Sequence, residues 1–282
     1  MLKSASILAA VGGFCLAASA AAAQPADGTA DWSGIYGGVN GGWSGQRNTD
    51  NSNLTVNQLT GVNNGSGVVT VPTTSSNQRQ RLNHDGFMGG GQLGVNGQAG
   101  NFVFGVEGDF DGMSGGARTA DTYTLPATAL TTGSTATVQR QMDANWTATL
   151  RGRLGIGVGR ALIYGTGGAA WVNTRDRAFY GYAPTVTSAV TTANPGTTFG
   201  PYANGASRED THAGWTVGGG VDFKTARNMT VGVEYRHTEA DYTDNFANSA
   251  ANSVSDISRM HYRDDAVLGR VNFKFSSLGH MF

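Results

Sequence analysis

The stretch 145–156 constrains the fold more than any other part of the chain, because apolar and polar side chains alternate along it. Trp146 and Leu150 share one parity, whereas Arg151 and Arg153 share the other. Successive side chains of a β-strand point to opposite faces, so one face of this strand is apolar and the other cationic. A wall with lipid on one side and a polar lumen on the other requires this arrangement. The stretch therefore predicts a strand of a transmembrane β-barrel.

Seven further stretches are predicted to be strands, and all but one of them show the same alternation, which gives an all-β chain with an even number of strands. The eight predicted strands are 32–44, 86–96, 101–111, 146–156, 161–173, 212–224, 229–238 and 265–275. Each has about 10–13 residues, which is the length at which a tilted strand crosses a bilayer. The lipid-facing parity of 161–173 stays open, because both of its faces are apolar.

The connections between these strands are short and long in turn. The four long ones, 45–85, 112–143, 174–211 and 239–263, are rich in Ser, Thr, Asn and Gly. Such a composition is typical of solvated, mobile loops. We therefore expect an eight-stranded antiparallel barrel with four long extracellular loops and short periplasmic turns.

The N-terminus has the pattern of a secretory signal peptide. Lys3 precedes an apolar stretch, 7–16, and a run of alanines, 17–23, that ends in an A-x-A cleavage site. We expect residues 1–23 to be the signal peptide and residues 24–282 to form the barrel domain. The chain's one cysteine, Cys15, lies in the export segment, so neither a disulfide nor a thiol nucleophile is expected in the exported protein.

Aromatic side chains test this topology in part, because the strand assignments did not use them. Outer-membrane barrels carry a girdle of aromatic residues at each membrane interface. The aromatic residues expected at the outer interface are Trp43, Trp146, Trp171, Trp215 and Tyr235, and those expected at the inner interface are Trp32 and Phe275.

Charged side chains gather on the opposite parity, which would face the lumen. The predicted lumen charge network comprises Glu107, Asp109, Asp111, Arg151, Arg153, Asp222, Lys224, Glu234, Arg236, Arg270 and Lys274. Side chains nearly fill the interior of an eight-stranded barrel, and buried charges are tolerated when they are paired. A lumen closed by ion pairs is the favoured interpretation. A narrow ion path lined by the same charges is the alternative.

Other kinds of site find little support. The formal net charge of −1 becomes −2 without Lys3, so the cationic footprint of a nucleic-acid-binding protein is absent. The stretch 165–170 fits G-x-G-x-x-A but lacks a following helix, and no histidine pair has metal-ligand spacing, so neither a cofactor nor a metal is expected. His237 beside Thr238 and Glu239 supplies hydrolase residue types, but these types are common here, and we expect no enzyme.

Several segments resemble the small outer-membrane β-barrel family of Gram-negative bacteria, known as porin-family or outer-membrane immunogenic proteins with an OmpA-like barrel. The matching segments are Trp32-Ser33-Gly34-Ile35-Tyr36-Gly37-Gly38, 162–169, 214–221, 231–236 and Val271-Asn272-Phe273-Lys274-Phe275. The resemblance covers the barrel scaffold and not the long loops. It implies a location in the outer membrane and a C-terminal aromatic residue read by the barrel-assembly machinery. Phe275 and Phe282 both remain candidates for that signal.

Together these features predict a structural and surface-interaction protein of the cell envelope, a surface antigen with a largely plugged lumen. Its expected partners are outer-membrane lipids and lipopolysaccharide, the assembly machinery and, through the loops, a host or phage surface. A porin-like channel for ions or small solutes is the alternative function. A barrel that is soluble in the periplasm is a further alternative.

Overall fold

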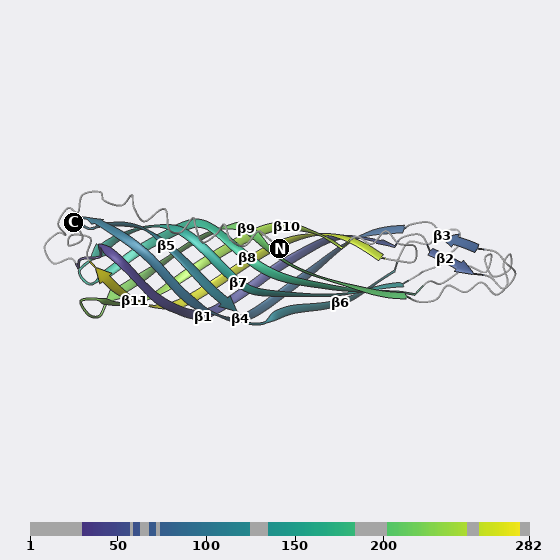
Figure 1. Cartoon of the computed structure of the whole chain (residues 1–282), viewed down its shortest axis with the longest axis horizontal. Coiled ribbons are helices and arrows are strands. Elements are labelled where there is room, and N and C mark those ends of the chain that lie inside the picture. The colour runs from purple at the N-terminus through teal and green to yellow at the C-terminus, as the bar shows by residue number, and fades with distance from the viewer. Residues whose placement is uncertain are drawn as a thin grey trace.

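The computed structural model describes residues 30–56, 59–62, 68–71, 74–124, 135–183, 202–246 and 254–276 (Figure 1). The expected signal peptide and Phe282 lie outside these residues. Every regular element in the described ranges is a β-strand. No helix in the described ranges is long and apolar enough to span a membrane.

The strands are long, and most exceed the length expected from the sequence. They are β1 (Gly34–Val56), β2 (Leu59–Val62), β3 (Val68–Val71), β4 (Thr74–Ala99), β5 (Phe102–Met113), β6 (Gly116–Thr124), β7 (Thr135–Val158), β8 (Ala161–Ala183), β9 (Tyr202–Lys224), β10 (Met229–Phe246) and β11 (Val254–Ser276). The β2 and β3 strands form a separate hairpin between β1 and β4.

Antiparallel pairing closes the other nine strands into a barrel. Their order is β5-β4-β1-β11-β10-β9-β8-β7-β6, and β5 also pairs with β7. Because β5 and β6 both pair with β7, one after the other along its length, they occupy a single position in the wall. The wall therefore has eight positions, and the all-β, eight-stranded antiparallel barrel predicted from the sequence is confirmed.

The break between β5 and β6 has a local cause at Ser114 and Gly115. The Ser114 N–H donates to the carbonyl oxygen of Phe87 at 2.9 Å, and the Phe87 N–H donates to Ser114 Oγ at 3.0 Å. Gly115 has φ +96°, and a Cβ there would lie 1.8 Å from His84 Nε2. Only glycine fits both the backbone conformation and the close approach, so the strand is interrupted here.

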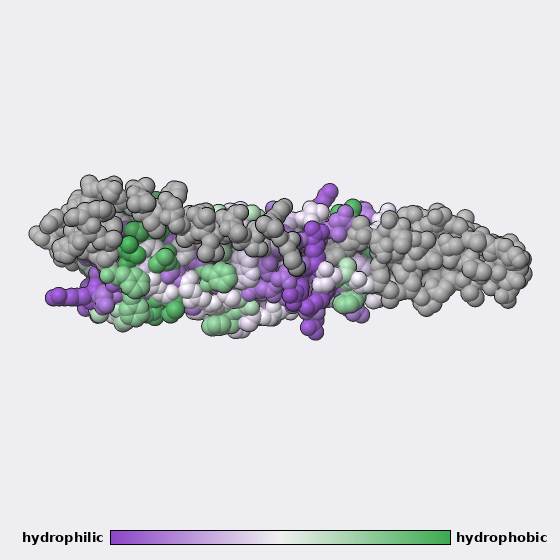
Figure 2. Space-filling view, viewed as in Figure 1, coloured by the Kyte–Doolittle hydropathy of each residue, from purple (hydrophilic) through white to green (hydrophobic). Residues whose placement is uncertain are grey.

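An apolar belt surrounds one half of the barrel. Trp43, Phe102 and Leu154 are 60%, 67% and 71% exposed, and in Figure 2 the apolar surface covers the half of the molecule next to the short turns. We call this half the turn end and the other half the loop end. The alternation also resolves β8, since Leu162 and Tyr164 are buried while Ile163 is 58% exposed.

The prediction that the four long polar connections are loops is wrong over much of their length, because many of their residues form strands. β1 continues to Val56 and β4 begins at Thr74, and the two stay paired without a shift from Gly34↔Asn96 to Val56↔Thr74. Composition misleads here because ladder hydrogen bonds join backbone groups and need no apolar side chains. The barrel wall therefore extends well beyond the apolar belt.

At the loop end this extension divides into two sheets. Pairing between β9 and β10 stops at Trp215↔Glu239, and pairing of β4 on its β5 side stops at Met88↔Met113. Beyond these points the described residues form one sheet of β4, β1, β11 and β10 and another of β6, β7, β8 and β9. Two seams without ladder hydrogen bonds separate these two sheets.

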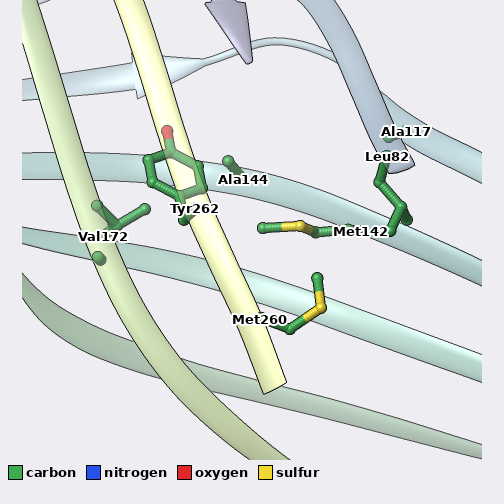
Figure 3. Packing of buried hydrophobic residues seen from close by; sticks show 8 residues of the cluster. Leu82, Ala117, Met142, Ala144, Val172, Met260 and Tyr262 are labelled. Atoms are coloured by element: carbon green, nitrogen blue, oxygen red, sulfur yellow. The ribbon is translucent and has the colours of Figure 1, made fainter. Parts of the chain in front are cut away.

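An apolar layer fills the space between the two sheets. Leu82, Ala240, Met260 and Tyr262 come from the first sheet, and Ala117, Met142, Ala144 and Val172 come from the second. Figure 3 shows Met142, Met260 and Tyr262 turned into this space. Each of these side chains is at most 4% exposed, so the extension is held together as a sandwich core.

Candidate functional site

A closed ring of ion pairs occupies the lumen within the apolar belt. Arg151 Nη2 lies 2.8 Å from Glu107 Oε1, and Arg151 Nη1 contacts Glu234 Oε1. Arg270 completes the ring through Glu107 Oε2 and Glu234 Oε2. Each carboxylate thus bridges both guanidinium groups, and all four side chains are at most 1% exposed.

This ring joins opposite walls of the barrel. Glu107 stands on β5 and Glu234 on β10, which are four positions apart in the eight-position wall. Arg151 on β7 and Arg270 on β11 are likewise opposite. Each guanidinium uses one terminal nitrogen for each of the two carboxylates. Such charge-assisted contacts are strong, and buried ions require partners of opposite charge. The ring therefore crosses the lumen from wall to wall.

The remaining central charges surround this ring. Asp109 Oδ2 lies 2.9 Å from Arg151 Nη2, and Arg236 Nη2 lies 2.7 Å from Asp111 Oδ2. Arg153 contacts Asp222, which lies two strands away on β9, and is 3.9 Å from Glu107. The structure thus brings together Glu107, Asp109, Asp111, Arg151, Arg153, Asp222, Glu234, Arg236 and Arg270, and it places Lys224 and Lys274 elsewhere.

Two tyrosines belong to this network although the sequence did not identify them as members. Tyr36 Oη donates to Glu107 Oε2 at 2.7 Å, and Tyr164 Oη donates to Glu234 Oε2 at 2.9 Å. The guanidinium of Arg153 lies 3.6 Å from the centre of the Tyr164 ring, a cation–π contact. The inward parity of Tyr36 was a usable signal, whereas Tyr164 lies on the strand whose two faces look alike.

Lys224 and Lys274 meet Asp31 at the turn end of the lumen. Lys274 Nζ lies 2.7 Å from Asp31 Oδ2, and Lys224 Nζ donates to the Asp31 carbonyl oxygen at 2.6 Å. The prediction that Trp32 lies at the inner membrane interface is wrong. Trp32 is 7% exposed and packs on Val103, because the chain turns into the barrel mouth before β1 begins. A cavity of about 30 Å³ beside Trp32 is large enough to hold water.

The other predicted interface aromatics lie on the outer surface or partly on it. Phe275 is 70% exposed at the turn end, and Trp43, Trp215 and Tyr235 are 60%, 46% and 49% exposed towards the loop end. Trp146 and Trp171 are partly buried. Trp43 pairs with Val267, and Val267 pairs with Tyr235, so these residues share one level of the wall. We call this level the aromatic rim.

Beyond the aromatic rim the extension encloses polar groups that the sequence did not single out. Asp176 hydrogen-bonds Asp244 across a seam, and His212 stacks on Tyr242 with ring centres 3.5 Å apart. Burial and the neighbouring Asp244 charge raise the pKa of Asp176 to about 7. Burial also raises the pKa of Asp244 and lowers that of His212. One seam is therefore held by side chains that can change charge.

A second buried cluster lies further into the extension. Arg140 Nε is 2.9 Å from Asp50 Oδ2, and Arg140 Nη2 contacts Asp256. Tyr180 Oη donates to Asp256 Oδ2 at 3.0 Å. Because Arg140 and Tyr180 belong to one sheet and the two aspartates to the other, this cluster ties the two sheets together.

His237, considered as a catalytic base, does not face a nucleophile among the described residues. Its ring lies on the outer wall, with Nδ1 2.7 Å from Asp265 Oδ1 and Nε2 3.4 Å from Glu239 Oε1. Thr238 points the other way, is 2% exposed and donates to Thr216 Oγ1 at 3.2 Å. The described residues contain no group of three or more His, Cys, Asp and Glu side chains arranged to hold a metal ion.

Comparison with known proteins decides the family. A family model described as the outer membrane protein beta-barrel domain matches residues 6–275. The chain belongs to this family. The barrel is therefore a protein of the Gram-negative outer membrane, its short turns face the periplasm, and the alternative of a soluble periplasmic barrel is excluded.

Among its relatives, the barrel is 30% identical over 156 residues to the 31 kDa outer-membrane immunogenic proteins of Brucella melitensis and Brucella suis. The alignment covers 55% of this chain and 54% of each relative, so it spans about half the length of the curated proteins it matches.

The solved structures that the chain matches include two outer-membrane proteins. OprG of Pseudomonas aeruginosa is 12% identical, with 86% of this chain and 96% of that chain covered and a TM-score of 0.42. The outer membrane protease OmpT of Escherichia coli is 9% identical over 86% of this chain and 96% of that chain, with a TM-score of 0.38.

Proposed function

We propose that this outer-membrane barrel is a structural and surface-presenting protein whose lumen does not conduct solutes. The ring of Glu107, Arg151, Glu234 and Arg270 carries this proposal, because it joins opposite walls of the barrel. The apolar layer around Met142 provides a second closure beyond the ring. Removing a charged partner from such a ring is unfavourable, so it does not open readily for passing ions.

The extension gives the proposal its surface role. From Phe87 at the aromatic rim to Thr74, β4 rises roughly 30 Å above the membrane, given about 3.3 Å per residue and a strand tilt of about 40°. Two buried charge clusters and an apolar layer stiffen it. Such a stalk would present the hairpin of β2 and β3 and the other connections to a host or phage surface.

Membrane lipids, lipopolysaccharide and the barrel-assembly machinery are the further partners that we propose. The apolar belt fits lipid tails, and Phe275, 70% exposed near the end of β11, fits an assembly signal. Phe282, the other candidate signal, lies outside the described residues. We further propose that the barrel is not an enzyme, because His237 and Thr238 stand on opposite faces of β10.

Single-channel recording in planar bilayers tests the closed lumen. The refolded mature chain, shown to be folded by a gel shift between unboiled and boiled samples, should give no discrete current steps. Arg151→Ala should remain silent as well, since the apolar layer still closes the barrel. A porin-like channel remains the second candidate function, because the same charges line the lumen. Reproducible steps that change with Arg151→Ala would establish the channel and overturn the closed lumen.

A further inference from the structure

Above the aromatic rim, the outward face of one sheet of the extension carries a cluster of arginines. Arg79 and Arg81 on β4 and Arg259 on β11 are exposed, and none of them has an ion-pair partner among the described residues. Other exposed charges nearby are neutralised: Arg47 pairs with Asp85 at 2.9 Å and Arg263 with Glu239 at 2.7 Å. Within this sheet, free positive charge therefore concentrates on β4 and β11.

Strand register places these arginines on either side of β1, whose outward side chains here are short and polar, and we call this three-strand surface the trough. Arg79 and Arg259 both pair with Asn51 of β1, so all three share one rung. On the adjacent outward rung, Arg81 and His261 both pair with Thr49. Neighbouring strands are about 4.8 Å apart, so the Cα atoms of Arg79 and Arg259 are separated by about 10 Å. Small polar side chains form the floor, and long cationic ones form the two walls.

The height of the trough above the aromatic rim corresponds to the saccharide layer expected around an outer-membrane barrel. Thr49 and Asn51 are six and eight residues beyond Trp43, which corresponds to roughly 15–20 Å above the aromatic rim along a tilted strand. Figure 2 shows a hydrophilic band across the middle of the molecule, next to the apolar belt. A lateral, outward-facing cationic surface at this height meets the lipopolysaccharide around the barrel before it meets any soluble molecule.

We propose that the trough formed by Arg79, Arg81, Arg259 and the β1 residues between them binds a phosphate-bearing saccharide of lipopolysaccharide. Guanidinium groups recognise phosphate through paired, charge-assisted hydrogen bonds, and two arginine walls about 10 Å apart can converge on one such group. The asparagine and threonine of the floor supply hydrogen bonds for sugar hydroxyls.

The opposite sheet provides a matched comparison surface. Arg118 on β6 is exposed without an ion-pair partner among the described residues, so the comparison uses two other arginines of this sheet. Arg175 pairs with Glu209 at 2.5 Å, and Arg177 pairs with Asp143 at 3.2 Å. These guanidinium groups are already neutralised, so the same ligand gains less from them. The inference is independent of whether the lumen conducts, because the trough lies on the outside of the wall.

Binding of lipopolysaccharide to the refolded full-length mature barrel tests the trough. The triple variant Arg79→Gln, Arg81→Gln, Arg259→Gln should bind phosphorylated lipopolysaccharide at least about tenfold more weakly, since several charge-assisted hydrogen bonds are lost. The control pair Arg175→Gln, Arg177→Gln should bind like the parent chain. Enzymatically dephosphorylated lipopolysaccharide should bind the parent chain as weakly as the phosphorylated form binds the triple variant.

Three outcomes would overturn the proposal. They are unchanged binding by the triple variant, an equal loss in the control pair, and full retention of binding after dephosphorylation. If the triple variant lost binding to a soluble sulfated polysaccharide but still bound lipopolysaccharide like the parent chain, the trough would be assigned to a soluble polyanion instead. All the substitutions are on exposed side chains, and an unboiled gel shift shows whether each variant has folded.

Discussion

At the scale of single residues, the chain places ionised side chains where a soluble barrel would place apolar ones. Arg151 touches Glu107, Asp109 and Glu234 and is fully buried. A guanidinium in that position satisfies three carboxylates from both sides of the lumen. Its removal leaves those carboxylates buried without their common partner, which is more costly than the pair itself is favourable.

Arg151→Ala should therefore lower the free energy of unfolding by about 3–5 kcal/mol. Arg175→Ala is the matched control, because its pair with Glu209 is 42% and 45% exposed and surface pairs contribute about 0–1 kcal/mol. Urea unfolding of both variants in the same lipid vesicles gives the comparison. Equal effects at the two positions would contradict a ring that stabilises the barrel.

Gly94 shows how closely the lumen is packed. A Cβ at this position would lie 2.4 Å from Tyr36 Oη and 2.5 Å from Tyr36 Cζ, so the ring covers the glycine. Gly94→Ala should displace Tyr36 from Glu107 and destabilise the barrel by about 1–3 kcal/mol. The same urea titration measures it, with Gly108→Ala as the control, since a Cβ there meets no atom closer than 3.6 Å. If Gly94→Ala and Gly108→Ala had the same free energy of unfolding, the displacement of Tyr36 would not destabilise the barrel.

At the scale of strands, the sequence predicts parity well and length poorly. Alternation places Glu107 and Arg151 inward because lipid contact excludes charge from the other face. It fails on β8, where Leu162 and Val172 also point inward, into the apolar parts of the interior. It fails again beyond the aromatic rim, where polar residues occur on both faces of the strands and no lipid imposes a pattern. The position of Trp32 was predicted wrongly because the residue lies before β1, where the alternation of a strand does not apply.

The seams of the extension are another feature that alternation cannot reveal, since pairing partners are set by the shape of the whole wall. The seam between β9 and β10 is bridged by the Asp176–Asp244 pair and the His212–Tyr242 stack. Side-chain contacts hold it in place of ladder hydrogen bonds, so its strength depends on protonation.

We therefore expect the extension to loosen as the pH rises. The pKa of Asp176 is raised from 3.8 to about 7 in the folded chain, first by burial and then by Asp244. Between these values the folded state retains a proton that the unfolded state has lost. The stability due to this proton is complete below about pH 4 and is lost as the pH passes through 7.

Amide hydrogen exchange, corrected for intrinsic rates, measures this loosening. Exchange in the extension segments of β8 and β10 should accelerate between pH 5.5 and 8, while the segments inside the apolar belt should not change. Asp176→Asn keeps the side chain neutral and should abolish the acceleration. A pH dependence that persists in Asp176→Asn would assign the effect to other groups.

At the scale of the whole molecule, one continuous wall spans the lipid of the membrane at the turn end and stands in water at the loop end. Within the belt the exterior is apolar and the interior is ionic, whereas beyond the rim the exterior is charged and the interior includes an apolar layer. The inversion follows from what surrounds each half, because lipid selects apolar exteriors and water selects polar ones. The barrel is thus a membrane anchor that continues directly into an extracellular sandwich.

This arrangement predicts which surfaces are reachable from outside the cell. Gln139 is exposed on the outer wall of the extension, and Arg227 lies in the short turn between β9 and β10. The chain's one cysteine, Cys15, precedes the expected cleavage site, so introduced cysteines can be labelled without background. A polymer-linked maleimide too large to cross the outer membrane should label Gln139→Cys on intact cells.

Arg227→Cys should react with the same reagent only after the outer membrane is permeabilised, because its turn faces the periplasm. Labelling of Gln139→Cys should be faster in a strain with truncated lipopolysaccharide, since the side chain stands among the saccharides and not above them. Prompt labelling of Arg227→Cys on intact cells would reverse the orientation of the barrel. Loss of Gln139→Cys labelling even with truncated lipopolysaccharide would mean that the membrane covers more of the wall than the apolar belt indicates.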